Sequence, residues 1–103
     1  MTRIVWSAKS LRDLEAVEGY VAQFNPVAAK RLVQKIIKRT RRLERFPSSG
    51  GYVEEDELKR YRQVLQGNYR VVYRHHPADG VVYVVTVLHA ARLLDPDLLE
   101  PEV

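Results

Sequence analysis

The 103-residue chain contains no cysteine, one methionine and one tryptophan. Without cysteine it can form no disulfide and offers no thiolate to a metal ion, so a reducing cytoplasm suits it. Its longest apolar run, residues 81–88, is too short to cross a bilayer, and the opening MTRIVWSAKS lacks the apolar stretch of a signal peptide. These absences predict a cytoplasmic protein with no membrane partner.

Length and charge narrow the class further. A chain of this length predicts one domain, which we expect to occupy residues 1–94. Residues 95–103, DPDLLEPEV, are acidic and proline-containing, so we expect them to form a flexible tail. The 17 Lys and Arg outnumber the 13 Asp and Glu, for a net charge of +4 and a pI near 9.6. This balance favours an acidic partner, either nucleic acid or protein.

The first half predicts a short strand over residues 3–6 and then two helices. Ser7 is suited to cap the first helix, because its hydroxyl can accept from the free amides of the first turn. Asn25 and Pro26 start the second helix, since asparagine caps well and proline tolerates the first helical position. Apolar residues recur at helical spacing on both helices, at Leu11, Leu14, Val17, Val21 and Phe24 and then at Leu32, Val33, Ile36, Ile37, Leu43 and Phe46.

The second half predicts three strands. Residues 58–65 alternate moderately, residues 69–76 follow a glycine turn, and residues 81–88 follow the turn Asp79-Gly80. The last strand is apolar on both faces apart from one threonine, as expected for a strand covered on both sides or for a central strand with helices on one face. The pattern predicts an α+β fold in which a helical hairpin packs on a small antiparallel sheet, in the order β-α-α-β-β-β.

The second helix carries many basic side chains and few acids to pair with them. The bases are Lys30, Arg31, Lys35, Lys38, Arg39, Arg41, Arg42 and Arg45. Such a helix can contact phosphates or an acidic partner, and it can equally be an ordinary solvated face. The pattern leaves both interpretations open.

Four further side chains are candidates for a functional site. Arg70 and Arg74 share one face of their strand, because side chains alternate with a period of two. Two unpaired arginines are costly to bury, so they either border a site that holds a phosphate or carboxylate, or face solvent. His89, at the end of the last strand, can add acid–base chemistry on RNA, and Arg92 follows it. The alternative is a strand-end histidine among surface arginines.

We predict neither a metal site nor a cofactor site. His75 and His76 are neighbours on a strand and therefore point to opposite faces, so they cannot hold one ion together. The sequence also lacks a glycine-rich phosphate loop and a notable spacing of serine, histidine and aspartate.

Five segments, in this order, resemble the ParE/RelE superfamily of toxins from type II toxin–antitoxin systems. They are SAKSLRDLE, AAKRLVQKI, LERFP followed by glycine, GNYRVVYR and VVTVLHAAR. The resemblance covers nearly the whole chain. It implies a toxin silenced by a cognate acidic antitoxin, ParD-like or similar, which binds across the helical hairpin and the sheet. Arg31, Lys35 and Arg42 are the candidate antitoxin contacts.

The resemblance also implies one of two toxic activities. ParE-like members poison DNA gyrase, whereas RelE-like members cleave ribosome-bound mRNA with basic residues and often a late Tyr or His. The ending VLHAAR resembles the ParE type, and no Tyr or His follows Arg92. We therefore predict a gyrase inhibitor rather than an enzyme, with Arg70, His89 and Arg92 as target-binding candidates. The alternatives are a ribosome-dependent endoribonuclease that uses Arg70, Arg74 and His89, and a non-toxic binding module.

Overall fold

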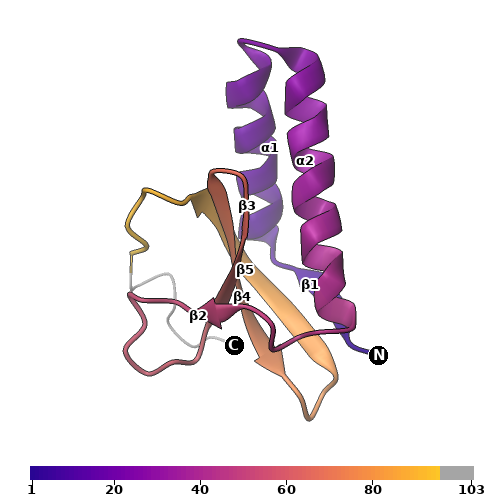
Figure 1. The fold of residues 1–103 in the computed structure, drawn as a ribbon, viewed down its shortest axis with the longest axis vertical. Helices are drawn as coiled ribbons and strands as arrows, with labels where there is room; N and C mark the ends of the chain where they lie inside the picture. Colours follow the sequence, from indigo (N-terminus) through magenta and orange to yellow (C-terminus); the bar gives the residue numbers. More distant parts are fainter. Residues whose placement is uncertain (96–103) are drawn as a thin grey trace.

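The computed structural model describes residues 1–95, so the tail expected at residues 95–103 lies, beyond its first residue, outside the described residues. Two helices and a 3-10 turn pack against a five-stranded sheet (Figure 1). The elements are β1 (Arg3–Trp6), α1 (Ala8–Ala22), α2 (Pro26–Arg41), the 3-10 turn η1 (Arg42–Glu44), β2 (Gly51–Tyr52), β3 (Arg62–Gln66), β4 (Tyr69–His76) and β5 (Val81–His89). The predicted α+β order is confirmed, with the two-residue strand β2 added.

Both helices begin where the sequence predicts. Ser7 Oγ accepts a hydrogen bond from the amide of Ser10 at 3.0 Å, and Asn25 Oδ1 accepts one from the amide of Ala28 at 3.0 Å. Pro26 occupies the first turn of α2, where its missing N–H removes no helical hydrogen bond. In the described part of the chain, no helix is long and apolar enough to span a membrane.

The apolar stripes of the helices are only partly buried. On α1 the buried line runs through Ser10 and Leu14. Leu11, one residue on from Ser10, is turned about 100° away and is 47% exposed, contrary to the prediction. Phe24 and Phe46 are also wrongly predicted as buried, at 73% and 61% exposed. Phe24 lies at the turn between the helices, which stands clear of the sheet (Figure 1), and Phe46 follows the turn that ends the helical face.

The sequence predicts an antiparallel sheet, and this is wrong in one respect, because the sheet is mixed. β1 runs parallel to β5, with Arg3 opposite Val81, whereas the other neighbouring strands are antiparallel. The strand order is β1-β5-β4-β3-β2, so β5 lies between two strands, as expected from its apolar faces. The parallel pair joins segments far apart in the sequence, and side-chain alternation carries no information about such a pairing.

The strand predicted over residues 58–65 is wrong at its start, because β3 begins at Arg62. The Asp56 carboxylate accepts hydrogen bonds from the amides of Arg60 and Tyr61 at 2.7 and 2.9 Å. Lys59 adopts a left-handed conformation with a φ of 53°, which interrupts extended backbone. The segment before β3 is therefore a carboxylate-capped turn.

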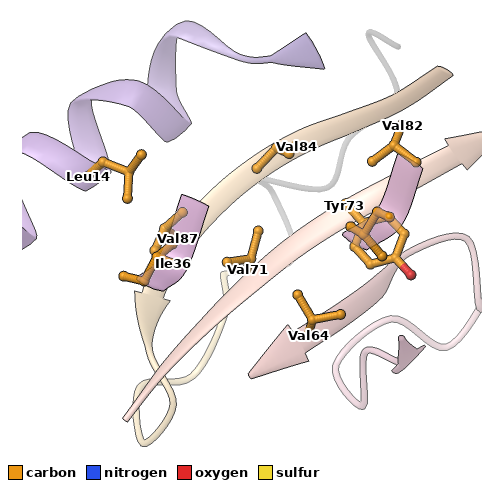
Figure 2. Close-up of a cluster of buried hydrophobic side chains, with 9 residues drawn as sticks. Leu14, Ile36, Val64, Val71, Tyr73, Val82, Val84 and Val87 are labelled. Carbon is orange, nitrogen blue, oxygen red and sulfur yellow. The ribbon is translucent and has the colours of Figure 1, made fainter. Parts of the chain in front are cut away.

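Each face of the sheet carries its own core. The cluster beneath the helices (Figure 2) contains Leu14, Ile36, Leu43, Val64, Val71, Tyr73, Val82, Val84 and Val87. The cluster on the opposite face contains Val53, Tyr61, Val72, Leu88 and Leu94. Alternate residues of β4 supply the two clusters, so Arg70, Val72 and Arg74 share one face, as predicted, and that face is the one away from the helices.

The glycine after LERFP is required by close packing. The Tyr73 hydroxyl donates to the Pro47 carbonyl at 2.8 Å and accepts from the Gly50 amide at 3.0 Å. A Cβ atom at Gly50 would lie 2.5 Å from the carbonyl oxygen of Gln63 and 2.7 Å from the Tyr73 oxygen. Burial raises the pKa of Tyr73, so its hydroxyl keeps the proton that holds this loop against the sheet.

Candidate functional site

Arg70 is held by four hydrogen bonds and is only 5% exposed. Its Nη1 donates to Glu55 Oε1 at 3.1 Å and to Gln63 Oε1 at 2.9 Å. Its Nη2 donates to Glu55 Oε2 at 2.6 Å and to the carbonyl of Arg92 at 2.6 Å. A bidentate pair of this kind is the strongest arrangement of a guanidinium and a carboxylate. The charge of Arg70 is therefore neutralised within the chain.

Glu55 completes this arrangement, which we call the Arg70 clamp: the side chains of Glu55, Gln63 and Arg70 with the backbone of Arg92 and Leu94. Glu55 Oε2 also accepts from the Leu94 amide at 2.8 Å. The hydrogen bond from Arg70 lowers the pKa of Glu55 from 4.5 to about 2, against a smaller opposing effect of burial. The clamp thus ties the acidic loop to the residues that follow β5.

His89 lies at the end of β5, opposite Tyr69 of β4. The two rings meet edge to face, with centroids 5.5 Å apart. His89 Nδ1 accepts from the Ala91 amide at 3.1 Å, so the neutral ring carries its proton on Nε2. The Arg92 amide donates to the His89 carbonyl at 3.0 Å, and this turn keeps Arg92 beside the histidine.

An open groove of about 460 Å³ lies between α1 and the ends of β4 and β5. Its polar and aromatic lining residues are Asp13, Tyr20, Tyr69, His89 and Arg92. We call it the α1–β5 groove. The Asp13 carboxylate accepts from the Thr86 hydroxyl, from the Val87 amide at 3.1 Å and from the Lys9 ammonium at 2.9 Å, which fixes α1 to β5.

Arg74 lies apart from the other candidates. It pairs opposite Tyr83, whereas Arg70 pairs opposite Leu88, and four residues along a strand span roughly 13 Å. The Arg74 guanidinium lies 5.7 Å from the centroid of the Tyr61 ring. The structure therefore joins Arg70 to the Arg92 carbonyl and keeps Arg92 beside His89, whereas Arg70 and His89 lie on opposite faces of the sheet and Arg74 lies apart from all three. Arg92 also borders a second cavity, of about 490 Å³, beside the Arg70 clamp.

The basic residues expected to bind a partner lie on the outer face of α2. Arg31, Lys35 and Arg42 are exposed, while Ile36 is fully buried on the opposite side. None of the three takes part in an ion pair within residues 1–95, where the recorded pairs are Lys9–Asp13, Arg60–Asp56 and Arg70–Glu55. Their charge is therefore directed to solvent.

His75 and His76 make unrelated contacts. His75 Nδ1 lies 3.5 Å from Ser48 Oγ, and the His76 ring meets the Tyr83 ring edge to face at 5.1 Å. Burial lowers the pKa of His75, with a further contribution from the charge of Arg62. Among residues 1–95, no group of three or more His, Asp or Glu side chains is placed to hold a metal ion.

Sequence reasoning missed Glu55 and Tyr69. A signal for Glu55 exists, because a buried strand arginine requires a carboxylate and residues 54–57 form an acidic run. Tyr69 could not be found in this way. In a regular hairpin, the register set at the β4–β5 turn would place residue 68 opposite His89. The bulge at Val72/Tyr73 shifts this register by one residue, so that Tyr69 lies opposite His89 instead.

Comparison with known proteins finds relatives of this chain in sequence and in fold. The chain is 35% identical over 95 residues to Toxin RelE2 of Caulobacter vibrioides, covering 90% of this chain and 100% of that one. Its fold matches a chromosomal ParDE toxin–antitoxin system from P. aeruginosa, with a TM-score of 0.69 at 20% identity over 86% of this chain and 96% of that one. It also matches the toxin–antitoxin complex RelBE2 from Mycobacterium tuberculosis, with a TM-score of 0.58 at 21% identity over 85% and 96%.

The family assignment rests on the sequence match. Residues 4–94 match the family described as the ParE toxin of the type II toxin–antitoxin system parDE. Apart from Arg3, the first residue of β1, this range contains every strand and helix of the fold together with the Arg70 clamp and the α1–β5 groove. The protein therefore belongs to the ParE toxin family of type II toxin–antitoxin systems.

Proposed function

We propose that this toxin inhibits DNA gyrase in the cytoplasm and that a cognate acidic antitoxin neutralises it. The match to the ParE family supports this choice, although the relative Toxin RelE2 carries the name of the other branch. The main support for the proposal is that Arg70 is buried and paired with Glu55. This is an observation on the chemistry of this chain and does not depend on the names of its relatives.

RNA cleavage needs cations placed on the phosphate and groups that move protons. Arg70 is buried and bound to Glu55 at 2.6 Å, so it would have to abandon this pair to hold a phosphate. Arg74 is roughly 13 Å away along the strand. In contrast, an inhibitor of gyrase needs only a surface that binds the enzyme. We assign this role to the α1–β5 groove, with His89 and Arg92 at its edge and Arg70 holding Arg92 in place.

One observation favours the ribonuclease alternative. The rings of Tyr69 and His89 lie 5.5 Å apart, so two groups that can move protons sit beside Arg92. A ribosome-dependent endoribonuclease could use this pair on mRNA, with Arg92 as the exposed cation. The Arg70 clamp weighs against this function, because it withholds the second cation.

The antitoxin is the partner implied by the family and by the two structural neighbours, which are described as a toxin–antitoxin system and a toxin–antitoxin complex. The outer face of α2 offers exposed cations at Arg31, Lys35 and Arg42. An acidic, partly disordered segment that crosses the helical hairpin and the sheet would meet these charges. Exposed ion pairs of this kind mainly raise the association rate.

The test is induction of the toxin without its antitoxin, followed by two measurements on the same cells. We expect gyrase-cleaved DNA and lost supercoiling, and no new mRNA ends at codon boundaries. With purified proteins, the toxin should inhibit supercoiling by gyrase, and Arg92→Gln should weaken inhibition by about tenfold or more. Arg12→Gln, which removes a positive charge from an exposed residue of α1 outside the groove lining, serves as the matched control.

Each alternative has its own result. Codon-specific cuts on ribosomes without any effect on supercoiling would replace the proposal by the ribonuclease function. Unimpaired growth with a folded, abundant protein would identify a non-toxic binding module. If Arg92→Gln inhibited gyrase as strongly as the wild type does, the α1–β5 groove would have no part in the proposed mechanism.

A further inference from the structure

The outer face of α2 and η1 is almost purely cationic. Eight residues between positions 30 and 45 are exposed, and seven of them are Lys or Arg, the eighth being Gln34. Five bases form one continuous line at spacings of three and four, which we call the basic row: Arg31, Lys35, Lys38, Arg42 and Arg45. The buried residues Ile36 and Thr40 occupy the other side of the same helix. The bases are therefore gathered on the side that faces solvent.

The basic row lies outside the ion pairs recorded in the described part of the chain, residues 1–95. Glu44 is the one acidic residue between positions 26 and 45. In Figure 1, α2 stands beside α1, and the two helices extend past the end of the sheet. The row therefore presents positive charge over several helical turns.

The chemistry of the row fits phosphates better than a protein surface. Protein interfaces depend on buried aromatic and aliphatic anchors and are depleted in lysine, whereas the exposed apolar residues nearest the row, Val27 and Phe46, lie only at its two ends. The span from Arg31 to Arg42 is roughly 16 Å at the helical rise. Duplex DNA carries about nine negative charges over that length, at one per 1.7 Å.

We propose that the basic row binds the phosphate backbone of duplex DNA without sequence preference. The inference rests on the proposed function, in which the toxin acts on an enzyme that holds DNA, and it adds a DNA contact to the gyrase contact of the α1–β5 groove. Antitoxin acids on Arg31, Lys35 and Arg42 would occupy the same charges, so antitoxin and DNA would exclude each other from this face.

The experiment measures binding of the purified full chain to a fluorescent 30-base-pair duplex of scrambled sequence, at several salt concentrations and without gyrase. Binding should weaken with salt with a log–log slope of about −4, as four or five phosphate contacts require. The double variant Arg31→Gln/Lys38→Gln should reduce the steepness by about 2 and weaken binding at low salt by about tenfold or more.

The matched control removes the same charge elsewhere. Arg12→Gln/Lys59→Asn changes two exposed bases outside the row, and the asparagine suits the positive φ at position 59. It should change the slope by less than about half a unit. Circular dichroism checks that both variants keep the fold, which the exposure of all four side chains leads us to expect.

Three results would overturn the inference. They are absence of saturable DNA binding at low salt, equal losses in the row variant and the control, and tighter binding to duplex RNA than to duplex DNA. Since gyrase is absent from this measurement, its failure leaves gyrase inhibition standing. Conversely, DNA binding with normal gyrase activity would overturn only the proposed function.

Discussion

Arg70 and Arg42 are the same residue type in opposite circumstances. Arg70 is 5% exposed on β4 and donates to Glu55, Gln63 and the Arg92 carbonyl. Arg42 is exposed at the end of α2 and has no side-chain ion pair within residues 1–95. One arginine is neutralised inside the protein, whereas the other presents its charge to solvent. The net charge of +4 conceals this division.

The contrast between the two arginines shows that the presence of an arginine and the pairing of its charge are separate kinds of evidence for function. Strand arginines are expected in both branches of the superfamily, so the presence of Arg70 does not choose between them. What distinguishes the mechanisms is whether the guanidinium is free. In this chain it is already bound to the Glu55 carboxylate, whereas Arg31, Lys35 and Arg42 are in none of the ion pairs recorded within residues 1–95.

The largest effect should come from the buried arginine. Arg70→Gln leaves the Glu55 carboxylate without its partner and should destabilise the fold by roughly 3–5 kcal/mol. Arg42→Gln should change stability by less than about 0.5 kcal/mol. Urea unfolding of both variants measures the contrast. Similar losses for the two would show that Arg70 is not the structural residue described here.

A comparable loss should follow from a cavity beneath the helices. Ile36 is fully buried on α2 (Figure 2), and Ile36→Ala should cost roughly 2–5 kcal/mol through lost burial and the cavity left behind. Lys38→Ala, on the exposed side of the same helix, should cost less than about 0.5 kcal/mol. Equal shifts in the urea midpoint would mean that the faces of α2 are assigned wrongly.

The acid sensitivity of the clamp gives a smaller effect. The pKa of Glu55 is about 2 in the folded chain, below its ordinary 4.5. A lowered carboxyl pKa contributes stability that is complete above about pH 5 and is lost as the pH falls toward 2. The difference in unfolding free energy between wild type and Glu55→Gln should therefore shrink by roughly 2–3 kcal/mol over that range. A constant difference would contradict the ionised clamp.

The exposed charges should affect rates more than stability. Reversing Arg31, Lys35 and Arg42 to Glu should slow association with the cognate antitoxin by about tenfold or more at low salt, with a smaller effect at high salt. Stopped-flow mixing at several ionic strengths measures this. An unchanged association rate and salt dependence would exclude these residues from the encounter.

The smallest effect is expected at His89. Gln at this position keeps an amide that can accept a hydrogen bond, as His89 Nδ1 does from Ala91, and loses the ring contact with Tyr69 and the capacity to exchange protons. A gyrase inhibitor does not require that capacity, so His89→Gln should retain most toxicity in a growth assay. Loss of toxicity in a folded variant, together with mRNA cuts by the wild type, would favour the ribonuclease.

The parts of the fold that depend on neighbouring residues were predictable from sequence. Caps at Ser7 and Asn25 and the strand Tyr69–His76 are governed by chemistry within a few residues, and the structure confirms them. The parallel β1–β5 pair and the bulge at Val72/Tyr73 depend on contacts between distant segments. Neither leaves a local signal.

The candidate site was predictable by residue type but not by partner. His89 and Arg92 could be chosen because a polar group that follows an apolar strand is conspicuous. The role of Arg70 could not, because the sequence does not show that the acidic loop folds beneath it and that Glu55, rather than Glu54 or Glu57, reaches its guanidinium. The two-pronged contact between Arg70 and Glu55 depends on where the fold places their two backbone segments. The order of residues near each segment does not show this placement.

The parallel pairing of β1 with β5 has a consequence for synthesis of the toxin. Arg3 is opposite Val81, so the first strand to leave the ribosome must wait for the last before it gains a neighbour in the sheet. Domains emerge during translation at about 5–20 residues per second, and until β5 appears the helical hairpin has no complete surface to pack on. The His89–Arg92 turn emerges later still. A chain interrupted before β5 can still pair β2, β3 and β4, but it leaves β1 without a neighbour and lacks one wall of the α1–β5 groove.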